Sequence, residues 1–444
     1  MSAIFQELES EVRYYCRVFP EVFTKAKGAE VFSEAGHRFI DFFAGAGALN
    51  YGHNHDFIKG RIMQYLAEDN IIHGLDFYTA AKRQFLETFR EKILVPAGLA
   101  YKVQFTGPTG TNAVEAALKL ARKVKRRPGV FAFMGAYHGM SLGSLAVTGH
   151  KRSRAAAGIP LTGVSFMPYP TGFMESFDTI GYLEEVIQDE RSGVEKPAAV
   201  IVETVQAEGG VNIAPASWLQ RLARLCLAQD ILLICDDIQV GCGRTGPFFS
   251  FERAAITPDI VTLSKSISGY GLPLSLVLMR PELDEWKPGE HNGTFRGNQL
   301  AFVGASAALD YRRQSGLEQQ TRERSEFVSS FLEHNIKPLH PGIEVRGVGL
   351  IWGIDLARLQ SSSLCEQVTE CCFQNGLLIE PSGRKGEVIK LLPPLNIEMN
   401  LLMEGCSILH KVLKKLLQNH NQKVKPLSPD AQEFSVAPVA GGRL

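Results

Sequence analysis

An aspartate and a lysine each follow an apolar run in the middle of the chain. Residues 231–235 form an apolar run that ends at Asp236, and residues 260–263 form a second run that leads to Lys265. Short apolar runs bounded by polar residues are typical of strands buried on both faces of a parallel sheet. Because open α/β sheets place their ligand groups at the carboxyl ends of the strands, we expect both side chains on the same edge of one sheet.

An amine and a carboxylate at one site suit pyridoxal 5'-phosphate (PLP). The aldehyde of this cofactor forms a Schiff base with an amine, and a carboxylate holds the ring nitrogen protonated, which makes the ring an electron sink for carbanion chemistry. Taken singly, a lysine or an aspartate is most often an exposed residue. Their joint position after two apolar runs, each followed by a glycine-rich segment, favours a cofactor site.

Two segments around these residues resemble a known family signature. Residues 235–246 read Cys-Asp-Asp-Ile-Gln-Val-Gly-Cys-Gly-Arg-Thr-Gly, and residues 257–266 read Thr-Pro-Asp-Ile-Val-Thr-Leu-Ser-Lys-Ser. Both resemble the class III (ω-amino acid) aminotransferases, and the likeness extends over roughly residues 23–417. It implies an α/β protein of PLP fold type I, in which a mostly parallel seven-stranded sheet is flanked by helices and a smaller α+β domain comes from both ends of the chain.

The resemblance assigns roles to the residues nearest the cofactor. Lys265 is the lysine that carries PLP, Asp236 is the partner of the ring nitrogen, and Gln239 lies near the phenolic oxygen. Two positions depart from the family pattern, because Asp237 stands where glutamate is usual and Val240 where threonine is usual. Neither departure alters the roles expected of Lys265 and Asp236.

A glycine-rich turn before a helix supplies the phosphate end of the expected site. Residues 103–112 open onto a strong helical pattern, and the free N–H groups at a helix N-terminus receive phosphate well. By resemblance, Gly110 and Thr111 contact the phosphate. Tyr137 and His138 follow a further apolar run, and we expect Tyr137 to stack on the pyridine ring with His138 as another cofactor contact.

Four more residues take roles through the resemblance alone. Glu203 supports the cofactor layer, and Glu208 takes the position of a switch glutamate that pairs with a substrate-binding cation and releases it for dicarboxylate substrates. Lys390 stands where the family has an arginine that grips the substrate carboxylate; a lysine holds a carboxylate as a point charge, without the planar fork. Thr294 reaches the PLP phosphate of the neighbouring subunit, which implies a homodimer with shared active sites.

The order of the expected elements divides the chain into four parts. We expect residues 1–55 to be the N-terminal segment of the small domain, 56–320 the large PLP-binding domain, 321–423 the C-terminal small domain, and 424–444 a flexible tail without a core of its own. Residues 43–53 are rich in small side chains, which permit close backbone approach, and by resemblance they form the active-site entrance.

Composition argues against several classes of partner. Among 444 residues, 47 Lys+Arg balance 47 Asp+Glu, which gives no electrostatic case for nucleic acid or an anionic membrane. No apolar run approaches the roughly 20 residues that a membrane helix needs, and the N-terminus lacks the basic-then-apolar order of a signal peptide. The eight cysteines are scattered without a CxxC pair, so we expect no metal site and a reduced, cytoplasmic location.

Three segments bear on the substrate. The Lys-Leu-Leu-Pro-Pro run at 390–394, together with residues 43–53 and 291–298, looks most like diaminobutyrate–2-oxoglutarate aminotransferases, which serve ectoine, siderophore and diamino-acid biosynthesis. The expected substrates are therefore a small-molecule amino donor, L-2,4-diaminobutyrate, and a 2-oxo acid. Other ω-amines (4-aminobutyrate, ornithine, taurine) and a PLP-dependent aminomutase or epimerase remain alternatives. The preferred direction and any assembly beyond a dimer stay open; Lys265 and Asp236 argue against a cofactor-free binding protein.

Overall fold

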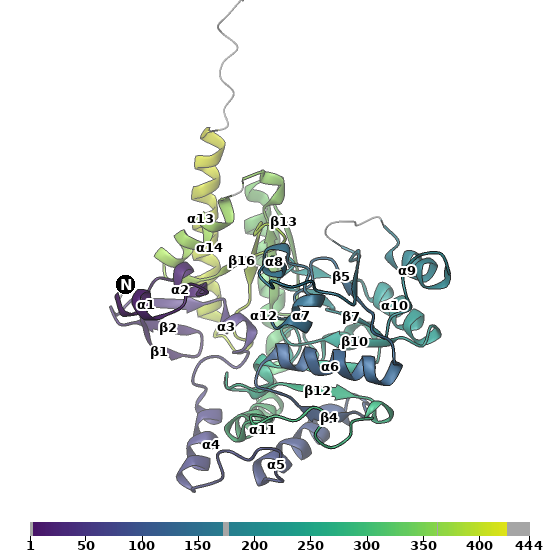
Figure 1. Cartoon of the computed structure of the whole chain (residues 1–444). Helices are drawn as coiled ribbons and strands as arrows, with labels where there is room; N and C mark the ends of the chain where they lie inside the picture. The colour runs from purple at the N-terminus through teal and green to yellow at the C-terminus, as the bar shows by residue number, and fades with distance from the viewer. Residues whose placement is uncertain (1–2, 172–176, 362, 424–444) are drawn as a thin grey trace, which may run out of the picture.

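The computed structural model describes residues 3–171, 177–361 and 363–423. The predicted tail, residues 424–444, lies outside the described residues. A central sheet with helices on both faces forms one part of the structure, and two smaller sheets with the last helices form the other (Figure 1).

The central sheet has seven strands in the order β4-β12-β11-β10-β7-β5-β6. Parallel pairing joins β6, β5, β7, β10 and β11, whereas β12 runs antiparallel to β11 and β4. The mostly parallel seven-stranded sheet expected from the sequence is thus confirmed. The strands are β4 Lys102–Phe105, β5 Val130–Phe133, β6 Val164–Met167, β7 Ala199–Val202, β10 Leu232–Asp236, β11 Ile260–Leu263 and β12 Leu276–Met279.

The inner strands are buried on both faces, which explains their unbroken apolar runs. In β10, Leu233 and Cys235 pack into one core cluster, and Leu232 and Ile234 pack into another. The first cluster includes residues of α5, α10 and α11, and the second includes those of α6. The longer helices around the sheet are α4 Asp56–Ala67, α5 Ala80–Phe89, α6 Gly110–Lys125, α9 Thr179–Gln188, α10 Ala216–Ala228 and α11 Gln299–Gln314.

Both ends of the chain contribute to the smaller part. The antiparallel strands β1, β2 and β3 are joined by β15, which pairs in parallel with β3; a second sheet has the order β13-β14-β17-β16. One core cluster contains Ile40 and Phe42 together with Leu402 and Leu409 of the last helix. The division of the chain into the four parts given above stays a prediction. The elements are β1 Phe23–Lys27, β2 Glu30–Ser33, β3 Arg38–Asp41, β13 Glu344–Val348, β14 Ile351–Asp355, β15 Leu377–Leu378, β16 Glu380–Ser382, β17 Val388–Leu391, α12 Leu317–Phe331, α13 Leu364–Gln374 and α14 Met399–Lys423.

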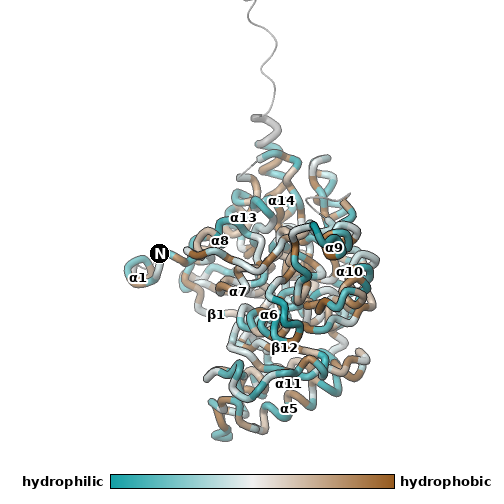
Figure 2. Tube along the Cα trace, turned by 45° about the vertical axis from the view of Figure 1, so that its right-hand side comes forward, coloured by the Kyte–Doolittle hydropathy of each residue, from teal (hydrophilic) through white to brown (hydrophobic). Residues whose placement is uncertain are grey.

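Short elements complete the chain. Helix α1 (Ala3–Leu8) stands apart from the body of the molecule, and residues 4–8 are all exposed (Figure 2). Within the described ranges, no helix has both the length and the apolar character needed to cross a membrane. The other short α-helices and strands are α2 Tyr15–Val18, α3 Ala44–Gly47, α7 Leu142–Val147, α8 Lys151–Ala155, β8 Val205–Gln206 and β9 Asn212–Ile213.

Candidate active site

The lysine and the aspartate lie on neighbouring strand ends. Strands β10 and β11 run parallel, with Asp236 opposite Thr262, and Lys265 follows β11 as the first residue of a short 3-10 helix. Lys265 has φ +52°, a left-handed conformation that non-glycine residues seldom adopt. Such a conformation costs about 1–2 kcal/mol and is concentrated at functional sites.

Both residues face a cavity of about 280 Å³, which approaches the roughly 300–1,000 Å³ typical of small-molecule sites. Nine of the residues expected at the site line it: Gly110, Thr111, Tyr137, His138, Glu203, Glu208, Asp236, Gln239 and Lys265. Sequence patterns did not single out the other lining residues as site residues: Thr109, Gly139, Met140, Val205, Ile238 and Val240.

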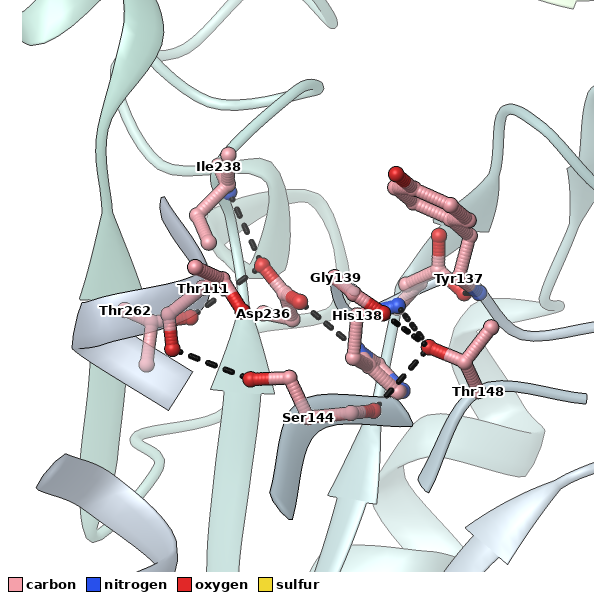
Figure 3. A network of polar contacts seen from close by, with 10 residues as sticks. Thr111, Tyr137, His138, Gly139, Ser144, Thr148, Asp236, Ile238 and Thr262 are labelled. Carbon is pink, nitrogen blue, oxygen red and sulfur yellow. Dashed lines mark hydrogen bonds and ion pairs between the residues drawn. The ribbon is translucent and has the colours of Figure 1, made fainter. Parts of the chain in front are cut away.

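The carboxylate of Asp236 is fixed from three sides (Figure 3). Nδ1 of His138 lies 2.6 Å from Oδ2 of Asp236. On the other oxygen, Oδ1, Asp236 accepts bonds from the Thr262 hydroxyl at 3.1 Å and from the Ile238 N–H at 3.2 Å. The backbone N–H of His138 donates to Thr148 Oγ1 at 2.9 Å, which holds this residue in place. These contacts leave Asp236, which is 4% exposed, little freedom to turn away from the cavity.

Lys265 is anchored by a segment of small residues from far away in the sequence. Its Nζ donates to the carbonyl oxygen of Ala46 at 2.8 Å, and Gln239 Nε2 donates to the same oxygen at 2.9 Å. Ala44, Ala46 and the glycines between and after them have positive φ values, so only small side chains make this turn at low cost. Burial lowers the pKa of the Lys265 amine to about 8, although the Glu208 carboxylate opposes the shift.

The N-terminus of α6 forms another wall of the cavity. Thr111 Oγ1 lies 2.6 Å from Ser141 Oγ, which orients the hydroxyl in the first turn of the helix. Gly139 has φ +123°, and a Cβ atom there would come within 2.6 Å of Thr111 Oγ1. The glycine therefore permits the close approach of two chain segments at the helix end, where N–H groups and the helix dipole favour an anion.

Glu203 and Tyr137 form a further side of the cavity. The Tyr137 backbone N–H donates to Glu203 Oε2 at 3.1 Å, and Tyr137 as a whole is 40% exposed. Burial, followed by the negative charge of Asp236, raises the pKa of Glu203 well above its ordinary value. The raised pKa favours the neutral, protonated form of Glu203.

Lys390 lies behind the cavity between two carboxylates. Its Nζ is 2.6 Å from Glu208 Oε1 and 2.9 Å from Glu380 Oε1. Lys390 and Glu380 face each other across the antiparallel pair β16–β17. Burial opposes ionisation of Glu208, but the ammonium groups of Lys390 and Lys265 outweigh it and lower its pKa. Sequence reasoning missed Glu380; the glycines at 383 and 386, which mark a hairpin turn, were the available signal.

Two further positions named in the sequence, Thr294 and Asp237, lie away from this cavity. Thr294 is exposed and does not line the cavity of its own chain. Asp237 is fully buried and accepts a bond from the Ser250 N–H at 3.0 Å, so it serves the packing beneath the site. Val240, at the other departure from the family pattern, lines the cavity as an apolar contact.

A buried arginine, Arg244, forms hydrogen bonds with chain segments around the site. Arg244 is fully buried, and its Nη1 donates to the carbonyl oxygens of Leu350 (2.9 Å) and Pro393. Its Nη2 donates to Asn50 Oδ1 at 2.6 Å. One side chain thereby connects the loop after β10, the segment of small residues and the chain that follows β17.

The arrangement fits a phosphorylated pyridine aldehyde. An amine, a fixed carboxylate and a helix N-terminus border one cavity, where they would meet the aldehyde, the ring nitrogen and the phosphate. His138 Nε2 is buried with no hydrogen-bond partner among the described residues, which is a further polar atom available to a ligand network.

The sequence pattern that defines the family Aminotransferase class-III matches residues 15–413. The chain belongs to this family. A diaminobutyrate–2-oxoglutarate transaminase from Nocardia farcinica is 55% identical to this class-III aminotransferase over 407 residues, covering 91% of this chain and 92% of the relative. A protein of the same name from Streptomyces coelicolor is 54% identical over 419 residues, covering 93% and 98%.

Solved structures share the fold. The ornithine aminotransferase from Toxoplasma gondii superposes with a TM-score of 0.83 at 26% identity, covering 94% of this class-III aminotransferase and 95% of that chain. Another structure of the Toxoplasma enzyme, with a TM-score of 0.82 at 27% identity over 94% and 95% of the two chains, is described as having partial occupancy of PLP at the active site. The expected PLP fold type I architecture is confirmed.

Proposed function

We propose that this class-III aminotransferase uses PLP to transfer the 4-amino group of L-2,4-diaminobutyrate to 2-oxoglutarate, forming L-aspartate 4-semialdehyde and L-glutamate. One observation carries the chemistry: Lys265, Asp236 and the N-terminus of α6 border the same cavity. The choice of substrates is supported by relatives of that name, which are 51–55% identical over more than nine-tenths of this chain.

Lys265 is the proton carrier of the proposed reaction. Bound PLP supplies the electron sink for negative charge on the reacting carbon. Lys265 Nζ removes the proton from the substrate carbon that bears the reacting amino group, and general acid–base catalysis of this kind contributes about 10²–10⁴-fold. A pKa of about 8 leaves a usable fraction of neutral amine near neutral pH.

The other residues of the site hold and orient the cofactor. Asp236, fixed by His138, holds the proton of the ring nitrogen, and Tyr137 covers the ring face. The first turn of α6, at Gly110 and Thr111, binds the phosphate. These roles rest on the geometry of side chains and helix ends that approach one cavity from different elements.

Glu208 controls access to Lys390. Lys390 is fully buried, whereas the Glu208 side chain is 31% exposed and lines the cavity. A carboxylate of 2-oxoglutarate therefore reaches Lys390 only when Glu208 turns aside. This exchange lets one cavity accept a diamino acid in one half of the reaction and a dicarboxylate in the other.

The active unit is a homodimer in this proposal. Thr294 is exposed, which suits a contact with the phosphate in a partner subunit. Large apolar side chains near it and along the segment between α4 and α5 are also exposed: Ile71, Ile72, Leu75, Phe77, Tyr78 and Phe295. Mixed dimers of the inactive Lys265→Ala chain with a Thr294→Ala chain should regain one intact site; activity no higher than in the parent variants would contradict shared sites.

The deciding experiment compares amine donors. Purified protein loaded with PLP is assayed with 2-oxoglutarate and a panel of L-2,4-diaminobutyrate, 4-aminobutyrate, L-ornithine and taurine, scored by glutamate formed. The highest kcat/KM is expected with diaminobutyrate. A higher value for another donor would change the substrate, and conversion of a donor without any 2-oxo acid would point to an aminomutase or epimerase.

The proposal includes a cytoplasmic location, which is supported by the eight free cysteines.

A further inference from the structure

The cluster behind the cavity contains more negative than positive charge. Lys390 Nζ contacts Glu208 and Glu380, so one ammonium faces two carboxylates. The two carboxylates are not equivalent, because the Glu380 side chain is 8% exposed and the Glu208 side chain is 31% exposed. Only Glu208 lines the cavity. The excess negative charge therefore lies on the side that a substrate reaches.

Strand pairing keeps Glu380 with Lys390 while Glu208 can move. Glu380 and Lys390 are opposite residues of β16 and β17, and cross-strand pairs of opposite charge are stabilising. Glu208 belongs to a different segment and also accepts a bond from Gln239 Nε2 at 3.0 Å. Removing one partner from a buried ion pair is strongly unfavourable, so the pair formed by Glu380 and Lys390 stays closed when Glu208 turns away.

We propose that Glu380 is a specificity-determining residue: by balancing the charge of Lys390 from the buried side, it leaves the carboxylate of Glu208 free to bind the α-ammonium of a diamino acid donor. This inference rests on the proposed function. Glu380 acts through Lys390 and Glu208 and is therefore a positioning residue. Without Glu380, Glu208 would be neutralised by Lys390, and a second ammonium on the donor would gain no counter-ion at this end of the cavity.

A comparison of two amine donors measures how strongly the site recognises the α-ammonium group. L-2,4-diaminobutyrate and 4-aminobutyrate differ only in the α-amino group, so the ratio of their kcat/KM values measures recognition of that ammonium. The assay is run at about pH 8.5, where Glu380 is ionised although burial raises its pKa to about 7. Glu380→Gln keeps the shape of the side chain and removes its charge; the ratio should fall tenfold or more.

A second measurement, the affinity for a dicarboxylate, should change in the opposite direction to the donor ratio. Glutarate, a dicarboxylate without the reacting carbonyl, is titrated into the PLP-loaded protein by calorimetry. Its dissociation constant should fall at least threefold in Glu380→Gln, because Lys390 is then left without a carboxylate partner once Glu208 turns aside for the dicarboxylate. Damage to the fold would weaken both ligands, so opposite changes distinguish the charge effect from a structural one.

Three further variants complete the test. Glu380→Asp should keep the donor ratio within about twofold, since it keeps the charge. Glu344→Gln removes a carboxylate from β13 of the same sheet, where it pairs with the exposed Arg358, and should change neither readout. Glu208→Gln should lower the donor ratio as Glu380→Gln does.

The outcomes separate the two proposals. An unchanged donor ratio in Glu380→Gln or in Glu208→Gln, or glutarate binding that does not tighten in Glu380→Gln, would overturn the role of Glu380. If the unaltered protein does not use diaminobutyrate, the proposed function fails, and the glutarate titration still decides whether Glu380 balances Lys390.

Discussion

Replacing Lys265 with methionine should abolish transamination and at the same time stabilise the cofactor-free protein. The amine is partly buried, and a pKa of about 8 instead of 10.5 means that its charged form is disfavoured in the folded state. The corresponding free energy is at most about 3.5 kcal/mol, at 1.4 kcal/mol for each tenfold change in proton affinity. The Ala46 carbonyl oxygen keeps the Gln239 donor after the replacement, so no buried acceptor is left unpaired.

The stabilisation by Lys265→Met should depend on pH, and the pKa of Lys265 in the folded and unfolded protein gives the direction. Below about pH 8 both the folded and the unfolded protein carry the Lys265 proton, and the folded state bears the full cost. Between about pH 8 and pH 10.5 the unfolded chain binds more protons at this residue, so the contribution of Lys265 to stability rises with pH. The advantage of Lys265→Met should therefore be largest near neutral pH and shrink as the pH approaches 10.

Urea unfolding of the cofactor-free proteins, followed by circular dichroism at equal protein concentration, measures the difference. Lys102→Met is the matched control, because Lys102 is an exposed lysine paired with Asp284 at 2.8 Å; surface pairs of this kind contribute about 0–1 kcal/mol. A stabilisation by Lys265→Met that stays constant from neutral pH to pH 10, or a destabilisation, would refute the argument from the buried amine.

Three other outcomes are expected. Asp236→Asn should lower kcat by about 10²-fold or more with a small change in KM, measured with diaminobutyrate, because it removes a charge that stabilises the transition state; an unchanged kcat would count against its role. Gly139→Ala should weaken PLP affinity in a fluorescence titration, since its Cβ would lie 2.6 Å from Thr111 Oγ1; unaltered affinity would show that the helix end tolerates the shift. Arg244→Lys should lower the free energy of unfolding by about 3 kcal/mol, because buried acceptors lose their donors; urea unfolding checks this, and a loss below 1 kcal/mol would speak against it.

Strand identity was predictable where both faces of a strand are buried. The run 260–263 coincides with β11, and the run 231–235 differs from β10 by one residue. Parallel pairing of these strands is what brings Asp236 and Lys265 to one edge, and apolar runs with polar ends signal it directly. The helix expected after the glycine-rich turn begins as early as Gly110, because glycine and threonine also fit the first turn.

Other parts of the site leave little trace in the sequence. The acceptor for Lys265 is the carbonyl oxygen of Ala46, a backbone atom that no residue type announces. Glu380 meets Lys390 only through the register of a hairpin, and a shift of one residue would turn its side chain to the opposite face. Thr294 acts, in our proposal, on a second chain, so its role cannot be read from a single subunit.

Arg244 has one more consequence, for how such a cavity can change during evolution. Two of its acceptors are main-chain oxygens, at Leu350 and Pro393, and every amino acid offers such an oxygen. Side chains along these two edges can therefore be exchanged while the scaffold beneath them stays anchored. Substitutions near these acceptors, at positions such as Lys390, could change which amine donor is preferred. The hydrogen bonds of Arg244 would still keep the scaffold rigid.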